Sequence, residues 1–211
     1  MLESMKKVSI IDYGLCNLFN VSNALEHLGA DAEIIESPDD IKKATHIILP
    51  GVGAFKNGMR GLAIRNLIEP IKEHIHNEKP FLGICLGMQM MMSKSFEFGE
   101  IEGLGIINGD VIKIPLSNSA NIKHKIPHIG WNRIIYKEDR LLTQQNNKSS
   151  MYFVHSYKAE CKNEENVIAH TLYNDVKITA IIKSKNAYGC QFHPEKSGKH
   201  GLRLLNEFIK L

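Results

Sequence analysis

The sequence predicts an α/β protein with a doubly wound, mostly parallel sheet flanked by helices and extended by antiparallel strands in its second half. In the first half, short β-branched runs alternate with helical apolar periodicity, a pattern typical of a parallel sheet covered on both faces. Right-handed crossovers then wind the helices onto both sides of that sheet. In the second half, strand patterns follow one another closely and only one further helix is indicated.

The first half contains four strand patterns and, apart from a helical stretch after the fourth strand, three helix patterns. The strands are apolar runs that end at turn residues, at 8–11, 32–36, 46–49 and 81–84. An apolar stripe from Leu18 to Leu28 predicts the first helix, and Gly29 stands where such a helix stops. Ser37 and Pro38 open a short second helix, and a stripe at 67–75 predicts a third.

The second half is richer in strands. They are expected at 111–114, 131–136, 151–157, 167–171, 177–183 and 187–192. Apolar residues at Leu202, Leu205 and Ile209 predict a closing helix, while the polar stretches 116–125 and 137–150 are expected to be loops. We expect residues 1–211 to form one domain.

Composition excludes several classes of protein. Apolar residues make up 43% of the 211 residues and the net charge is +3, so the chain can bury a core and has no strongly basic character. The basic clusters lack interleaved aromatic residues, no apolar run approaches a membrane span, and no cysteine pair has metal-ligand spacing. We therefore expect no nucleic-acid, membrane, metal or cofactor binding. Without a secretory signal, the expected location is the cytoplasm, and translation could start at Met1 or Met5.

A strand running into Gly83-Ile84-Cys85-Leu86-Gly87 and then into a helical stretch, 88–92, has the arrangement of a nucleophile elbow. The central residue of an elbow sits on a tight turn, and the two glycines let neighbouring backbone approach. The N-terminus of the following helix would favour a thiolate at Cys85. The alternative is that Cys85 is a small buried apolar side chain, as we expect for Cys16, Cys161 and Cys190.

A thiol nucleophile needs a base and a group that orients the base. His193 and Glu195 follow a strand and supply both within three residues, whereas His74 and His76 are expected on a polar helix face. Leu86 N–H would give one half of an oxyanion hole, and the turn containing Gly51 and Val52 the other half. That turn ends a strand, at the edge where open α/β sheets bind ligands.

Five segments together resemble the class I (triad) glutamine amidotransferases: 50–53, 83–89, 127–132, 152–157 and 191–197. With Asp12-Tyr13-Gly14 and Asn17 near the start, they resemble in particular the glutaminase subunits of imidazole glycerol phosphate synthases. The match runs in order along nearly the whole chain, so it is more specific than any single motif.

The resemblance implies a glutaminase mechanism that needs no cofactor. Cys85 would attack the glutamine carboxamide to form a thioester, His193 would pass a proton to the leaving ammonia, and Glu195 would orient His193. The oxyanion would be held at Gly51, Val52 and Leu86, in a turn that closes when substrate and partner are engaged. The glutamine itself would be held by Gln89 and the segment His155, Ser156, Tyr157.

The resemblance also implies a heterodimer with a β/α-barrel cyclase subunit, which would receive the ammonia for histidine biosynthesis. Residues that would face this partner are Pro127, His128, Trp131 and Lys196. A separate partner also makes chemical sense, because free ammonia is mostly protonated at neutral pH and a chain of 211 residues leaves little room for a second active site. Trp131 could equally be a core residue.

Other functions stay open. The segments 96–99 and 103–105, and Cys16 where glycine is common, also resemble a branch that supplies ammonia for amidation of surface-polysaccharide or flagellin sugars. A stand-alone Cys-His-Glu hydrolase is a second alternative, against which Gln89 and Lys196 argue. A binding subunit without catalysis is a third, and the intact triad argues against it.

Overall fold

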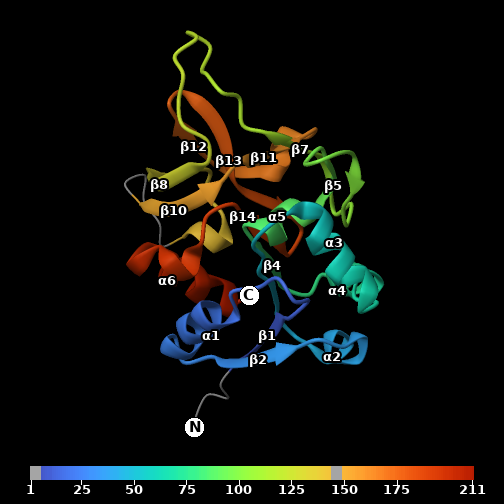
Figure 1. Cartoon of the computed structure of the whole chain (residues 1–211). Coiled ribbons are helices and arrows are strands. Elements are labelled where there is room, and N and C mark those ends of the chain that lie inside the picture. The colour runs from blue at the N-terminus through green and yellow to red at the C-terminus, as the bar shows by residue number, and fades with distance from the viewer. Residues whose placement is uncertain (1–5, 144–148) are drawn as a thin grey trace.

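The computed structural model describes residues 6–143 and 149–211. Within them the largest sheet has eight strands in the order β2-β1-β3-β4-β14-β13-β12-β9 (Figure 1). The first five strands of this order are mutually parallel, and the last three join by antiparallel pairing. In sheet order their bounds are Asp31–Ile35, Lys7–Ile11, Ile47–Leu49, Phe81–Ile84, Ala187–Cys190, Val176–Ser184, Val167–Tyr173 and Ile135–Tyr136. The predicted fold class is confirmed.

Helices cover both faces of the parallel half of the sheet. In Figure 1, α1 (Leu18–His27) and α6 (Gly198–Ile209) lie on one side, and α2 (Pro38–Lys43), α3 (Phe55–Ile64) and α4 (Ile68–His76) lie on the other. Each side has its own buried apolar cluster, one containing residues of α1 and α6 and the other residues of α2, α3 and α4. These two buried apolar clusters therefore hold in place the strand ends that carry the site.

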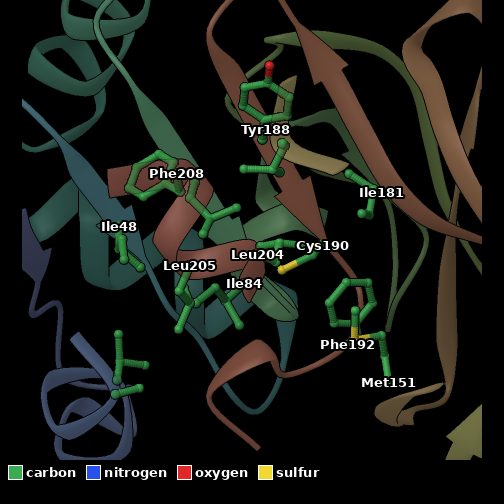
Figure 2. Packing of buried hydrophobic residues seen from close by; sticks show 14 of the residues in the cluster. Ile48, Ile84, Met151, Ile181, Tyr188, Cys190, Phe192, Leu204, Leu205 and Phe208 are labelled. Carbon is green, nitrogen blue, oxygen red and sulfur yellow. The ribbon is translucent and has the colours of Figure 1, made fainter. Parts of the chain in front are cut away.

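The core beneath α6 joins residues from both halves of the sequence. Leu204, Leu205 and Phe208 recur at helical spacing and are completely buried. Figure 2 shows them near Ile48 and Cys190, which come from β3 and β14. The last helix of the chain thus packs over strands from both halves of the sequence and ties them together.

Two smaller sheets use strands from the second half. The four-stranded sheet has the order β11-β7-β5-β6, and the two-stranded sheet pairs β10 with β8. The bounds are Tyr157–Cys161, Ile107–Lys113, Met92–Ser95 and Ile101–Glu102 for the first sheet, and Ser150–His155 and His128–Arg133 for the second. Short 3₁₀ helices occur at Arg140–Leu142, Glu164–Asn166 and Pro194–Lys196.

Some expected boundaries are wrong. The helical stretch expected at 88–92 ends early: α5 spans Leu86–Met90, and Met92 begins β5 because the carbonyls of Met90 and Met92 accept hydrogen bonds from Leu104 and Gly105. The strand expected at 131–136 is split, because β8 ends at Arg133 and β9 starts at Ile135 in a different sheet. Strands β5, β6 and β11 were not expected.

Helix α3 is not among the helices expected from the sequence. Its apolar positions Phe55, Met59 and Leu62 have helical spacing, but Gly58 and Gly61 lower the helix propensity between them. A Cβ at Gly58 would lie 2.7 Å from the Met90 sulfur, so this glycine lets α3 approach α5 closely.

The alternative starts, Met1 and Met5, and part of the expected loop at 137–150 lie outside the described residues. Among the helices that are described, none is long and apolar enough to cross a membrane.

We expect Phe208→Ala to lower the free energy of unfolding by about 3–5 kcal/mol, the usual loss for removing a buried phenylalanine ring. Phe208 is 0% exposed, whereas Phe19 on α1 is 73% exposed and serves as the matched control. Phe19→Ala should change stability by no more than about 0.5 kcal/mol. Urea unfolding followed by circular dichroism measures both, and equal losses would contradict the assigned core.

Candidate active site

Cys85 lies on the turn between β4 and α5, in a conformation that few side chains adopt. Its φ is 55° and its ψ is −106°, outside the favoured regions for a residue other than glycine. The turn is held from both sides, because Cys85 N–H donates to the Cys190 carbonyl at 2.8 Å and Gln89 N–H donates to the Cys85 carbonyl at 3.1 Å. Such strain persists only where the surroundings enforce it, and it is concentrated at functional sites.

The two glycines of the elbow are required by close approach of the backbone. A Cβ at Gly87 would lie 1.8 Å from the Leu49 carbonyl oxygen, and a Cβ at Gly83 would lie 2.7 Å from the Gly87 carbonyl. Neither contact is possible between real atoms, so only glycine fits either position. The tight packing of β3, β4 and α5 therefore depends on these two residues.

The turn delivers Cys85 to a cavity of about 290 Å³ at the carboxyl end of β4. Cys85 is buried, with 8% of its surface exposed, and it lines the cavity. The lining residues come from five parts of the chain: Val52, Gly53, Cys85, Leu86, Gln89, Glu97, Val154, His155, Ser156, Tyr157 and His193. A small polar molecule of amino-acid size fits this volume.

His193 and Glu195 form a buried pair beside Cys85. The His193 Nδ1 and Glu195 Oε1 atoms are 2.8 Å apart, and both side chains are almost fully buried. Burial disfavours the charged imidazolium, but the contact with Cys85 and then the contact with Glu195 outweigh it and raise the pKa of His193 to about 10. With Nδ1 held by the carboxylate, Nε2 is the nitrogen left to exchange a proton at the sulfur.

The expected oxyanion donors are close together but already occupied. Leu86 N–H donates to the Gly51 carbonyl at 3.4 Å, and Val52 N–H donates to the Leu15 carbonyl at 3.1 Å. A carbonyl oxygen therefore stands where a substrate oxyanion would have to bind. The arrangement differs from the expectation that both N–H groups face the cavity.

The four residues expected to hold glutamine all line the cavity. Gln89 Nε2 donates to the Tyr157 carbonyl and to Gln191 Oε1, each at 3.0 Å. His155 lies within 2.8 Å of the same Tyr157 carbonyl, through its Nδ1 atom. Gln89 and His155 are thus anchored to one backbone oxygen, next to the half-buried Ser156.

Glu97 is a cavity residue that the sequence analysis did not assign. Its Oε2 atom accepts a hydrogen bond from Phe55 N–H at 2.7 Å, at the start of α3, and the side chain lines the cavity. The segment Phe96-Glu97-Phe98-Gly99 contained one signal, an acid between two aromatic residues, but nothing in its spacing linked it to Cys85.

The residues expected to face a partner divide into two groups. Pro127, Trp131 and Lys196 are exposed, and Trp131 is 58% exposed with its ring 5.8 Å from that of Tyr152, so it is not a core residue. His128 is a correction. It is completely buried, because it faces away from the exposed side of β8 and stacks on aromatic rings inside.

The structure also places His74, the other three cysteines and the groups that could bind a metal. His74 is a second correction: it is 3% exposed, not on a polar face, because its Nε2 bonds to the Pro80 carbonyl at 3.0 Å. Cys190 is buried and Cys16 and Cys161 are half-buried, none of them lining the cavity. Within residues 6–143 and 149–211, no group of three or more histidine, cysteine or acidic side chains could hold a metal ion.

The sequence of this chain matches a known family and proteins within it. Residues 9–211 match the family described as glutamine amidotransferase class-I. A Legionella pneumophila (strain Lens) protein named imidazole glycerol phosphate synthase subunit HisH 1 is 49% identical, and the alignment covers 98% of this chain and 100% of that protein. A Geobacillus protein named imidazole glycerol phosphate synthase subunit HisH is 41% identical, with 97% and 96% covered.

Solved structures share the fold at low sequence identity. The PurLQS structure from Thermotoga maritima superposes with a TM-score of 0.74 at 18% identity, covering 98% of this chain and 99% of that one. The glutaminase domain of CTPS from Trypanosoma brucei, solved with bound acivicin, gives a TM-score of 0.65 at 15% identity, covering 98% and 94%.

The pKa of His193 should depend on both Cys85 and Glu195. In nitrogen-15 NMR of histidine-labelled protein, we expect His193 to titrate with a pKa of about 10. Cys85→Ala should lower that pKa, because burial then acts with less opposition. Glu195→Gln should also lower it, because the carboxylate stabilises the imidazolium. An unchanged pKa in Cys85→Ala would contradict the pairing.

Proposed function

Because the chain belongs to the class I glutamine amidotransferases, we propose that it is the glutaminase subunit of an imidazole glycerol phosphate synthase. One observation carries the proposal: Cys85 and His193 line one cavity of about 290 Å³, and Glu195 holds His193 from behind it. Relatives that match over nearly their full length, at 41% and 49% identity, are named as this subunit. They support delivery of the ammonia to histidine biosynthesis over its delivery to a surface sugar. We also propose that residues 1–211 form a single domain, which the match over 9–211 supports.

The triad divides glutamine hydrolysis into two steps. The Cys85 thiolate attacks the side-chain carboxamide carbon, and the His193 imidazolium gives its proton to the departing nitrogen, so ammonia leaves and a glutamyl thioester remains. Water then attacks the thioester and gives a proton to His193. Glutamate leaves, and the thiolate and imidazolium are restored. Glu195 keeps Nε2 of His193 directed at the reacting atoms throughout.

The oxyanion hole forms by reorientation of the turn at Gly51 and Val52. When the 51–52 peptide rotates, its carbonyl leaves Leu86 N–H, and the two N–H groups turn to the oxygen of the tetrahedral intermediate. The hydrogen bonds that oppose the rotation are those from Leu86 N–H to Gly51 and from Val52 N–H to Leu15. The proposed trigger is engagement of substrate and partner together.

Glutamine is held at its amino-acid end by the other cavity residues. The Glu97 carboxylate supplies the one acidic group of the described cavity lining and pairs with the α-ammonium group. Gln89 and the backbone at His155, Ser156 and Tyr157 position the α-carboxylate. This places the carboxamide next to Cys85.

The proposed partner is a β/α-barrel cyclase subunit that forms a heterodimer with this chain. Trp131 and Ile129 on β8 are 58% and 57% exposed, an aromatic and an aliphatic anchor on one strand. With Pro127 and Lys196, they form the contact surface. A sheltered passage of ammonia between subunits keeps it unprotonated and therefore nucleophilic.

Cys85→Ala should abolish glutamine-dependent synthesis by the heterodimer, because the thioester cannot form. Synthesis from added ammonium salt at alkaline pH should be unchanged, because the acceptor site lies in the other subunit. Product formation from each nitrogen source is measured with the purified complex.

Cys161→Ala is the matched control, since Cys161 is half-buried and does not line the cavity. It should keep both activities. Loss of both activities in Cys85→Ala would contradict the division of labour. Full glutamine hydrolysis by this chain without its partner would favour a stand-alone hydrolase, and glutamate release by Cys85→Ala would favour a non-catalytic role for the triad.

Glu97→Gln should raise KM for glutamine about tenfold to a hundredfold, the range expected when a charge-assisted hydrogen bond worth about 1.5–3 kcal/mol is lost. The amide oxygen can still accept from Phe55 N–H, so the fold should be preserved. Glu160→Gln is a control on the exposed part of β11 and should leave KM unchanged. Steady-state kinetics decide, and a KM equal to wild type would remove Glu97 from the substrate site.

A further inference from the structure

A chain of hydrogen bonds runs from the cavity to strand β8 through two histidines. His155 Nδ1 is 2.8 Å from the Tyr157 carbonyl oxygen, and His155 Nε2 is 3.0 Å from His128 Nδ1. His128 Nε2 is 2.9 Å from Asn132 Oδ1, and the amide nitrogen of Asn132 donates to the Leu172 carbonyl at 3.0 Å. The proposed mechanism assigns no role to His128, which is 0% exposed.

Both ends of this series of hydrogen bonds are acceptors. This limits how many protons the two histidines must supply. A carbonyl oxygen stands at one end, and Asn132 Oδ1 stands at the other because its amide nitrogen is committed to Leu172. Three contacts therefore need three ring protons, but two neutral imidazoles carry only two. Burial lowers the pKa of His155 to about 3 and also lowers the pKa of His128, so the pair is neutral at physiological pH. One of the three contacts must lack its proton.

Burial decides which contact that is. The contact between the two histidines is fully buried, whereas both end contacts, with Tyr157 and with Asn132, are partly buried. Of the two ends, the missing proton costs less at Asn132, because the other contact of its amide, with the Leu172 carbonyl, is exposed to water. The Tyr157 carbonyl belongs to the backbone and cannot turn away from a bare nitrogen. Two bare nitrogens facing each other inside would leave His155 Nε2 unpaired in the more costly place. His128 therefore carries its proton on Nδ1 and gives it to His155 Nε2, which leaves the His155 proton on Nδ1, facing Tyr157.

We propose that His128 is a positioning residue for the glutamine site, an inference that rests on the proposed function. By fixing the tautomer of His155, it directs an N–H at the Tyr157 carbonyl, the same oxygen that accepts Gln89 Nε2 at 3.0 Å. Two donors therefore hold this carbonyl and the backbone beside it. The strand that presents Trp131 to solvent is thus connected, through His128, to the residues that hold the substrate.

Three substitutions at His128 separate its contacts. His128→Phe keeps the stacking on Phe153 and Tyr173, whose ring centroids lie 5.0 and 4.1 Å away, but removes both hydrogen bonds. His128→Asn places an amide nitrogen near the position of Nδ1 and can still donate to His155. His128→Gln reaches the position of Nε2, toward Asn132, and does not.

With the heterodimer, we expect His128→Phe and His128→Gln to raise KM for glutamine about tenfold, while kcat changes less than about threefold, since uniform binding of substrate is lost. His128→Asn should restore KM to within about threefold of wild type. Ammonium-dependent synthesis should be the same in all of them. A purely structural role would instead lower thermal stability and both activities together in all three variants, and would overturn the proposal.

Equal KM in wild type and His128→Phe would also overturn it, as would rescue by His128→Gln in place of His128→Asn. Nitrogen-15 NMR of the wild-type chain gives a test that needs no variant to fold: His155 should be protonated on Nδ1 and bare on Nε2, and the opposite tautomer contradicts the proposal. If wild-type heterodimer does not hydrolyse glutamine, the proposed function fails, whereas the tautomer of His155 is measured independently of that result.

Discussion

The site depends on one backbone constraint, the positive φ of Cys85 between β4 and α5. At φ 55° the chain turns sharply enough to leave the buried strand and present a side chain to the cavity. The conformation is enforced by the hydrogen bond from Cys85 N–H to Cys190 and by backbone contacts at Gly83 and Gly87 that leave no room for a Cβ. Because β14 pairs directly with β4, the same contact brings the segment that carries His193 and Glu195 alongside the sulfur. Without this constraint, Cys85 and His193 would no longer lie side by side.

The cavity also shows how one residue type is given two different tasks. His193 and His155 both line it, but their pKa values are shifted in opposite directions. Burial disfavours the charged form of each. His193 has a sulfur and a carboxylate as neighbours, which overcome burial, whereas His155 has a carbonyl and a second imidazole, which do not. One imidazole is therefore suited to carry a proton in the reaction and the other to hold its surroundings in place as a neutral group.

Much of the fold and the centre of the site could be predicted from sequence, because the determining signals are local. The alternation of strand and helix, the glycine spacing around Cys85 and the short His193-Pro194-Glu195 segment all lie within a few residues of one another. Glu97, the buried position of His128 and the occupied N–H groups at Val52 and Leu86 could not be predicted. Each depends on pairing between distant strands or turns, such as the register of β8 with β10, which no local pattern encodes. The early end of α5 at Met90 has the same origin, since hydrogen bonds from residues 103–105 override a good helical run.

The position of Trp131 has a practical consequence for spectroscopy. It is the only tryptophan in the sequence, and it lies at the surface on β8 and not among the core residues. Its indole is already largely in water in the folded chain, so its emission spectrum changes little when the core melts. Covering the ring with another molecule would move it into an apolar environment and shift that emission to shorter wavelength. The emission wavelength of Trp131 thus responds to association and changes little on denaturation.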